Sequence, residues 1–283
     1  MSALLDALSA PAPLVLAPTG MVPTRESTPH VPLTPAEVAD DVAACWELGI
    51  TSVHLHARDK DGHPTWHRDV YARLVGAVRE RVPEVLINVS TSGRTWSELE
   101  RRADVLALDG DLAPDIASLT PSSLNFLTAA SVNAPDVVRG LAGIMRDRGI
   151  VPEFEVFDLG MISMMRRLVA EGLAREPLLV NLFFGNLAGL QPTALEVGLA
   201  AERLPAGTVW SGAGLGDYQG AAHLLSIATG GGVRTGLEDA LHPHGTREEL
   251  ATNAGLVEQA HLMLSAAGRA VMTPAELRER LEP

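Results

Sequence analysis

The sequence predicts an α/β fold, a TIM (β/α)8 barrel that forms a single domain over residues 1–283. Strand-like and helix-like segments alternate along all 283 residues and give eight βα units, as in a TIM barrel. Apolar residues make up 46% of the chain and aromatic residues only 4%, so the core must consist of small aliphatic side chains, as in parallel sheets covered by helices. Neither a GxGxxG nor a GxxxxGK[ST] motif follows a strand, which disfavours the alternative of a doubly wound, nucleotide-binding sheet.

The strands are expected where short apolar runs occur, at residues 13–17, 52–57, 85–90, 115–119, 151–157, 178–184, 208–212 and 232–236. Helices are expected where amphipathic stretches separate these runs, at residues 34–48, 67–82, 135–148, 160–172, 192–204, 219–228 and 246–267. The first helix has a clear beginning, because Thr34 precedes Pro35 and Glu37 completes a capping box. Gly172 and Gly268 follow two helical runs and indicate where they end.

Composition excludes several classes of function. The formal net charge is −13 and the isoelectric point is about 5.1, so no basic patch is expected for nucleic acid or an anionic membrane. No run approaches the ~20 apolar residues of a membrane span, and the first residues do not resemble a signal peptide. The single cysteine, Cys45, is expected to be buried in a helix, and without disulfides a cytoplasmic location is expected. Lys60, the only lysine, lies in a polar turn, which argues against Schiff-base catalysis.

The most informative motif is His54-Leu55-His56, at the end of the second predicted strand. Side chains alternate faces along a strand, so both imidazoles face the same side, roughly 7 Å apart. Two rings at this separation can converge on one ion, because each metal–nitrogen bond is only about 2 Å long. Single histidines in apolar runs are mostly structural, so the prediction of a metal site depends on a third ligand.

A catalytic zinc site needs three protein ligands and an open position. No histidine lies between His67 and His223, which argues against a four-histidine site with ligands on the middle strands. The last strand of a closed barrel borders the first, so a residue that follows it can reach the second strand. We therefore expect Glu238 to be the third ligand. His242-Pro243-His244 is expected to be an exposed loop.

Other polar residues gather where predicted strands end, which is the catalytic end of a TIM barrel. They are Asn88, Ser90, Thr91, Ser118, Thr120, Glu153, Glu155, Arg234 and Asp239. Glu153 and Glu155 share one face of an apolar strand, where a buried carboxylate needs a cation or metal partner. Three pairs of residues have a structural role as the alternative. Asn88 and Ser90 would cap the next helix, and Arg58 and Asp59 would form an ion pair. Glu238 and Asp239 would begin a helix.

The polar residues belong to sequence blocks that occur in the same order in a known family. The blocks are Thr19-Gly20, HLHARD (54–59), NVSTSG (88–93), LNF (124–126), PEFE (152–155), GGVRTGLED (231–239) and ATNAGLVE (251–258). With the HLHxRD and RxGxED motifs together, the chain resembles the β-keto acid cleavage enzymes over nearly its whole length. The resemblance implies a zinc-dependent TIM barrel, a homo-oligomer that is a tetramer or a dimer, and a reaction of a β-keto acid with acetyl-CoA that gives acetoacetate and a new acyl-CoA.

The resemblance also implies a role for each residue of the site. The implied Zn²⁺ ligands are His54, His56 and Glu238. The implied catalytic residues are Asp239 as the base, Arg234 as its partner, Glu155 as a positioning group and Ser90 as a contact near the transferred groups. The implied substrate-binding residues are Thr19, Asn88, Thr91, Ser118 and Thr120. A carboxylate base beside an arginine is expected to stay ionised, because the cation lowers its pKa.

Four positions differ from the family members that cleave an amino keto acid. Val22 replaces an acid that would meet the substrate's ammonium group, which favours a neutral or apolar keto acid. Thr120 replaces an asparagine, and Ser92 replaces the first glycine of a turn. Leu215 replaces an arginine, so a cation that would help to bind the coenzyme or a carboxylate is lost from the rim.

Three functions follow from these observations. The first is zinc-dependent cleavage of a β-keto acid with a CoA thioester as co-substrate. The second is another zinc-dependent aldolase, lyase or hydrolase on the same barrel, which would turn over without coenzyme. The third is a non-catalytic, metal-retaining metabolite-binding protein, which would bind ligands without turnover. The intact metal and base residues favour the first.

Overall fold

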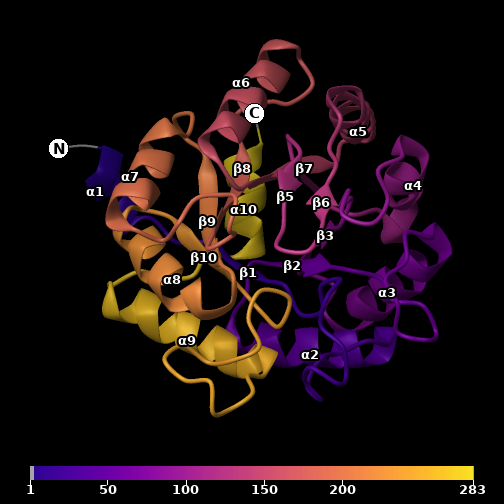
Figure 1. Cartoon of the computed structure of the whole chain (residues 1–283), viewed down its shortest axis with the longest axis horizontal. Coiled ribbons are helices and arrows are strands. Elements are labelled where there is room, and N and C mark those ends of the chain that lie inside the picture. The colour runs from indigo at the N-terminus through magenta and orange to yellow at the C-terminus, as the bar shows by residue number, and fades with distance from the viewer. Residues whose placement is uncertain (1–2, 283) are drawn as a thin grey trace.

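Eight parallel strands form a closed barrel in the computed structural model, which describes residues 3–282 (Figure 1). The strands are β1 (Leu14–Leu16), β2 (Ser52–Leu55), β3 (Leu86–Val89), β4 (Ile116–Leu119), β7 (Val151–Val156), β8 (Leu179–Phe184), β9 (Val209–Gly214) and β10 (Gly232–Thr235). They follow the chain order around the barrel, and β1 closes it by pairing with β2 and β10. The predicted TIM barrel is confirmed, and every barrel strand overlaps its predicted range.

Helices surround the barrel as a ring (Figure 1). Those that correspond to predicted helices are α2 (Pro35–Leu48), α3 (Arg68–Arg81), α5 (Pro135–Arg148), α6 (Leu159–Ala170), α7 (Ala194–Arg203), α8 (Gln219–Ala228) and α9 (Asn253–Ala266). The predicted capping box of α2 is confirmed, because Thr34 and Glu37 each accept a backbone N–H of the other. The predicted start of α9 at residue 246 is wrong. Residues 246–252 are not helical, and Thr252 caps the helix by accepting the N–H of Gly255.

The sequence patterns do not predict several short elements. These are α1 (Ala3–Ser9), α4 (Leu99–Ala103), α10 (Pro274–Leu281), the 3-10 helices η1 (Asp104–Ala107), η2 (Gly110–Leu112) and η3 (Gly216–Tyr218), and the hairpin of β5 (Leu124–Asn125) with β6 (Ala130–Ser131). Most are too short for a periodic pattern to stand out. For α10 a signal exists, because Thr273 and Glu276 form the same capping box as at α2. Within residues 3–282, no helix combines the length and apolarity needed to cross a membrane.

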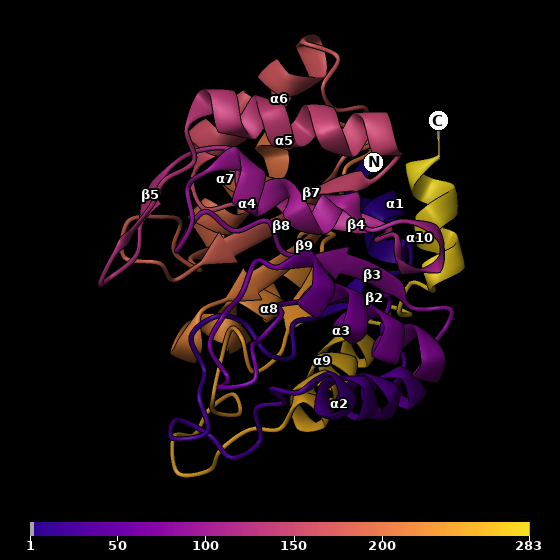
Figure 2. The ribbon, with the colours of Figure 1, turned by 90° about the vertical axis from the view of Figure 1, so that its right-hand side faces the viewer.

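The two ends of the barrel differ. At the end where the strands begin, Met272 and Leu277 of the C-terminal segment pack against inward-facing apolar residues, namely Leu86, Ile116, Leu179 and Val209. Figure 2 shows α10 at this end and the β5–β6 hairpin projecting from the opposite end. Polar side chains, among them Asn88, Glu153 and Asn181, are buried on β3, β7 and β8. Because α10 covers one end of the barrel, access from solvent is expected at the end where the strands finish.

Candidate metal centre and active site

His54, His56 and Glu238 come together where the strands finish. His54 lies on β2, His56 directly follows it, and Glu238 lies three residues beyond the end of β10. The strand between them, β1, leads into Gly20, whose φ is +64°. A Cβ atom at Gly20 would lie 2.6 Å from Glu238 Cγ, so any residue other than glycine at this position would clash with the Glu238 side chain. The predicted same-side orientation of the imidazoles is confirmed, because their Nε2 atoms are 3.0 Å apart.

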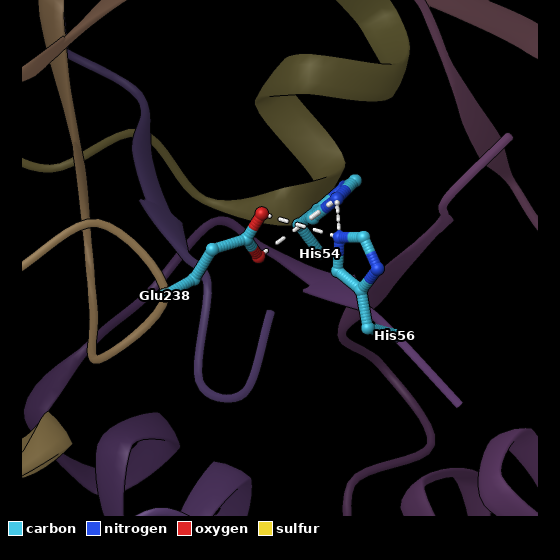
Figure 3. Close-up of side chains that lie close together, drawn as sticks. All are labelled: His54, His56 and Glu238. Carbon is cyan, nitrogen blue, oxygen red and sulfur yellow. Dashed lines mark hydrogen bonds and ion pairs between the residues drawn. The ribbon is translucent and has the colours of Figure 1, made fainter. Parts of the chain in front are cut away.

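The three side chains fit a divalent cation (Figure 3). His56 Nε2 lies 3.2 Å from Glu238 Oε1, and His54 Nε2 lies 4.0 Å from Glu238 Oε2. Within residues 3–282, no other trio of histidine, cysteine or acidic side chains brings its ligand atoms within 4.8 Å of one another. Glu238 Oε2 is buried without a hydrogen-bond partner among these residues, so it is free to bind a cation. Two imidazoles and one carboxylate form a donor set that suits Zn²⁺.

The protonation states of His54 and Glu238 also suit a metal. Burial lowers the pKa of His54 well below its usual value, although Glu238 opposes this effect. The imidazole is therefore neutral and presents a lone pair. Burial raises the pKa of Glu238, but attraction by His56 and Arg234 outweighs it and lowers the pKa well below the usual value. Metal binding requires neutral imidazole and ionised carboxylate, and His54 and Glu238 favour these forms before any ion arrives.

Arg234 links the acidic side chains of the site. Its Nε and Nη2 donate to the two carboxylate oxygens of Asp239 at 2.9 and 3.3 Å. Nη2 also lies 3.0 Å from Glu238 Oε1, and Nη1 lies 3.8 Å from Glu155 Oε1. The guanidinium is held 4.8 Å from the centre of the Phe183 ring. Burial lowers the pKa of Arg234, but Asp239 and Glu238 outweigh this effect and raise it, so the group stays charged.

The pKa of Asp239 differs from the expectation. We expected the neighbouring arginine to lower it, but burial is the larger effect and raises the pKa to about 6, with Arg234 opposing and Glu238 adding to the rise. The expectation neglected the cost of placing a carboxylate in a buried site that already contains another one. A carboxyl with this pKa is still mostly ionised at neutral pH and can both take up and release a proton.

The remaining predicted residues fall into two groups. Ser90 and Thr91 line cavities that also expose His56, and Thr120 donates from Oγ1 to Glu155 Oε2 at 2.9 Å. Thr19, Ser118 and Asn88 form the second group, and their buried side chains hydrogen-bond to protein groups. Thr19 donates to the Pro32 carbonyl, Ser118 Oγ accepts the N–H of Thr91, and the Asn88 amide donates to Glu153. The substrate-binding role of both groups stays a prediction.

A cavity of about 90 Å³ opens beside the metal-binding trio. Besides Arg94, the polar residues that line it are His56, Ser90, Ser92, Glu155, Glu238 and Asp239, and the apolar residues are Met21, Val22, Phe126, Phe157, Phe183 and Leu215. Among residues 3–282, Arg94 is the one arginine or lysine that lines this cavity. A larger hollow of about 1020 Å³ lies at the α10 end. It contains no trio of metal-ligating side chains among residues 3–282.

Arg94 is a functional candidate that the sequence analysis missed. Its guanidinium lies 4.2 Å from the centre of the Phe126 ring, and its side chain makes no ion pair within residues 3–282. Burial lowers its pKa, whereas Glu238 raises it. A signal was present, because Arg94 directly follows the Asn-Val-Ser-Thr-Ser-Gly block and is the first basic residue after the third strand.

Residues that the sequence assigned to other roles lie outside the metal centre. Cys45 is fully buried, as predicted, and Lys60 is exposed and paired with Asp61. His242 and His244 lie in a loop, as predicted. The suggested ion pair between Arg58 and Asp59 does not form. Arg58 instead donates to the backbone carbonyls of Gly20, Gly62 and Pro23, and Asp59 accepts the backbone N–H groups of Asp61 and His63.

Comparison with known proteins identifies relatives over almost the whole chain. A family profile described as beta-keto acid cleavage enzyme matches residues 11–282. The chain is 35% identical over 280 residues to a 3-oxoadipate:acetyl-CoA acetyltransferase from Cupriavidus necator, covering 97% of this chain and 95% of the relative. It is 32% identical over 261 residues to a 3-keto-5-aminohexanoate cleavage enzyme from Fusobacterium nucleatum, covering 91% and 93%.

Solved structures support the fold. A ternary complex of ObcA with a C4-CoA adduct and oxalate superposes with a TM-score of 0.79 at 23% sequence identity. The alignment covers 89% of this chain and 67% of the ObcA chain. The apo structure of ObcA superposes with a TM-score of 0.77 at 22% identity, and this chain spans about two thirds, 65%, of its length. At this identity the likeness concerns the barrel fold alone.

Proposed function

Because the chain belongs to the β-keto acid cleavage enzyme family, we propose that it is a zinc-dependent acyltransferase that converts a β-keto acid and acetyl-CoA into acetoacetate and a new acyl-CoA. One observation carries the proposal: His54, His56 and Glu238 converge beside the Arg234–Asp239 pair at the end of the barrel where the strands finish. The names of curated relatives, which pair acetyl-CoA with 3-oxoadipate, 3-dehydrocarnitine or 3,5-dioxohexanoate, support acetyl-CoA as the co-substrate.

The chain's own residues supply binding and proton transfer. A divalent cation held by the trio would act as a Lewis acid that polarises the ketone and stabilises developing negative charge. Asp239, oriented by two hydrogen bonds from Arg234, takes a proton from the carbon between carboxylate and ketone. Attack of that carbon on the acetyl thioester forms a carbon–carbon bond and releases the CoA thiolate. The thiolate then attacks the original ketone carbon, and cleavage of the bond between the two carbons gives the new acyl-CoA. Asp239 returns its proton to the carbanion, which becomes acetoacetate. Glu155, which accepts a hydrogen bond from Thr120, lies 3.8 Å from Nη1 of Arg234 and supplies a further negative charge beside the guanidinium.

The acid is proposed to carry a neutral or apolar acyl chain. Val22 lines the cavity where an amino keto acid would need a carboxylate, and its neighbours Met21, Phe126 and Leu215 are apolar. An ammonium group packed against these apolar side chains would lose part of its hydration. A hydrocarbon chain would instead gain roughly 25 cal/mol for each Å² of apolar area removed from water.

Arg94 is proposed to replace the cation that Leu215 lacks. Both residues line the same cavity, so an anionic group that enters can reach either position. The net charge of −13 repels an anionic coenzyme, and a local cation at the cavity offsets that repulsion. The free hydrogen-bond donors of a guanidinium match the oxygens of a phosphate or a carboxylate.

Two further properties rest on the family and on composition. We propose that the protein is a homo-oligomer, a tetramer or a dimer, and that it works in the cytoplasm. Light scattering during gel filtration of the untagged protein tests the first, and a mass near the 29.9 kDa of one chain at micromolar concentration would contradict it.

A panel of β-keto acids tests the proposed reaction. Each acid is incubated with the zinc-loaded protein and acetyl-CoA, and new CoA esters are identified by mass spectrometry. We expect acetoacetate and one acyl-CoA in equal amounts, with straight-chain or branched apolar acids preferred over amino keto acids. The control omits acetyl-CoA and should give no cleavage.

Two outcomes would replace the proposal. Cleavage of an acid at the same rate without acetyl-CoA would identify a zinc-dependent aldolase, lyase or hydrolase. Tight binding of a keto acid with no turnover of any panel member would identify a metabolite-binding protein.

A further inference from the structure

His54 has a second ring nitrogen that the metal centre does not use. Its Nε2 faces His56 Nε2 at 3.0 Å and Glu238, so its Nδ1 points away from the trio. His54 is fully buried, and Nδ1 has no hydrogen-bond partner among residues 3–282. When Nε2 binds a metal, Nδ1 must carry the proton, and a buried N–H without an acceptor costs roughly 1–3 kcal/mol.

Asn88 is the neighbour that can accept a hydrogen bond from this N–H group. It lies on β3 directly opposite His54 in the strand register, and it is also fully buried. Its Oδ1 has no hydrogen-bond partner among the described residues. No well-aligned hydrogen bond joins the two side chains in this structure.

Glu153 determines which end of the Asn88 amide faces His54. Asn88 Nδ2 donates to Glu153 Oε2 across β4, and Glu153 has no exposed surface. Burial raises the pKa of Glu153 to about 7. In either protonation state a carboxyl oxygen accepts the hydrogen bond from the NH₂ end of the Asn88 amide, which leaves the carbonyl end for the imidazole. The opposite orientation would place an N–H donor against Nδ1 and favour the tautomer whose proton occupies the metal-binding nitrogen.

We propose that Asn88 and Glu153 form a support behind the metal centre. Glu153 orients the amide of Asn88, and Asn88 Oδ1 accepts a hydrogen bond from the Nδ1–H of His54. The support holds the imidazole in the tautomer and orientation that leave Nε2 free for the cation. Asn88 is therefore a positioning residue and not a substrate contact. This inference rests on the proposed metal centre, but it concerns residues that the reaction does not touch.

Metal affinity tests the support without any assay of turnover. Zn²⁺ is titrated into metal-free protein in competition with a chromophoric chelator, and circular dichroism verifies that each variant is folded. Removal of a hydrogen-bond partner of a metal-ligating histidine lowers metal affinity about 10- to 100-fold. We expect a loss of this size for Asn88→Leu and for Glu153→Leu, and near wild-type affinity for Glu153→Gln, whose carbonyl still accepts from Asn88.

Asn181→Leu is the matched control. Asn181 is a buried asparagine on β8, and both of its polar side-chain atoms lack partners among residues 3–282, but β8 is not adjacent to β2. We expect Asn181→Leu to bind Zn²⁺ within about twofold of the wild type, whatever its thermal stability. Equal affinities for Asn181→Leu and Asn88→Leu would overturn the inference. If Asn88→Leu does not fold, the comparison of Glu153→Leu with Glu153→Gln decides. Failure of the wild type to bind Zn²⁺ would instead refute the metal centre itself.

Discussion

Arg234 contacts three carboxylates while its own side chain is almost completely buried. A buried guanidinium without these partners would be strongly destabilising, and the carboxylates without it would be protonated more easily. The residue thereby keeps Glu238 ionised for a metal and holds Asp239 in one orientation. Its Nη1 is buried without a hydrogen-bond partner among the described residues, 3.8 Å from Glu155 Oε1.

The proposed base is tested by Asp239→Asn. The amide keeps the shape of the side chain and still accepts one hydrogen bond from Arg234, but it cannot take up the proton. We expect Zn²⁺ binding to persist and kcat to fall by about 10²- to 10⁴-fold in the acyl-CoA assay. Asp115→Asn is the control, because Asp115 also pairs with a partly buried arginine, Arg79, at the far end of the barrel. Unchanged turnover in Asp239→Asn would mean that another group is the base.

The proposed role of Arg94 is tested by Arg94→Met, which keeps the apolar stem and removes the charge. We expect the KM for acetyl-CoA to rise roughly 10- to 100-fold, because a hydrogen bond to a charged group contributes about 1.5–3 kcal/mol. The increase should disappear with acetyl-pantetheine, which lacks the phosphates of the coenzyme. Arg101→Met is the control, since Arg101 also lies over an aromatic ring, that of Trp66, but not in this cavity.

Two results would change the assignment of Arg94. An increase confined to the KM of the keto acid would mean that Arg94 binds the carboxylate of that substrate. Equal KM values for Arg94→Met and wild type, for both substrates, would remove Arg94 from the site.

At the scale of elements, the turn after β1 determines where the Glu238 side chain can lie, because Gly20 in this turn has no side chain. A Cβ at Gly20 would lie 2.6 Å from Cγ and 2.9 Å from Cβ of Glu238. Gly20→Ala should therefore displace Glu238 and lower the Zn²⁺ affinity at least 10-fold. Gly110→Ala is the control, because its φ of +57° carries similar backbone strain, roughly 1–2 kcal/mol, with nothing within 4 Å of the added atom. Equal Zn²⁺ affinities in the two variants would show that Gly20 does not govern the position of Glu238.

Helix α8 carries a histidine that should make stability depend on pH. His223 is buried against the Arg234 carbonyl, and burial lowers its pKa from 6.5 to about 4. Above pH 6.5 the imidazole is neutral in both the folded and the unfolded chain, so it has no effect. As the pH falls from 6.5 towards 4, only the unfolded chain takes up the proton, and stability is lost.

The size of this loss follows from the shift in pKa. A shift from 6.5 to about 4 corresponds to roughly 3 kcal/mol of unfolding free energy, lost progressively over that range. Urea unfolding of wild type and His223→Gln at several pH values checks it, because glutamine keeps a donor for the carbonyl and does not titrate. We expect the difference between the two proteins to change between pH 6.5 and 4. A constant difference would contradict the assignment.

At the scale of the whole molecule, periodic patterns were sufficient for the barrel. Buried parallel strands are mostly apolar and their helices amphipathic, so β2 and α2 were predictable from the sequence pattern. The convergence of Glu238 with His54 followed from the closure of the barrel. The pKa of Asp239 was not predictable, because it depends on burial and on several charges at once. Arg94 was missed because its position depends on a loop and a hairpin that have no periodic pattern.

Zinc titration of the metal-free protein tests the central claim most directly. Stoichiometric Zn²⁺ is added in steps to chelator-treated wild type and His54→Ala, and acyl-CoA formation is measured at each step with a β-keto acid from the panel. The predicted result is activity that rises from zero and saturates at one Zn²⁺ per chain in the wild type, with neither tight binding nor activity in His54→Ala. Full turnover by the metal-free wild type would contradict the claim that His54, His56 and Glu238 hold the cation on which the chemistry depends.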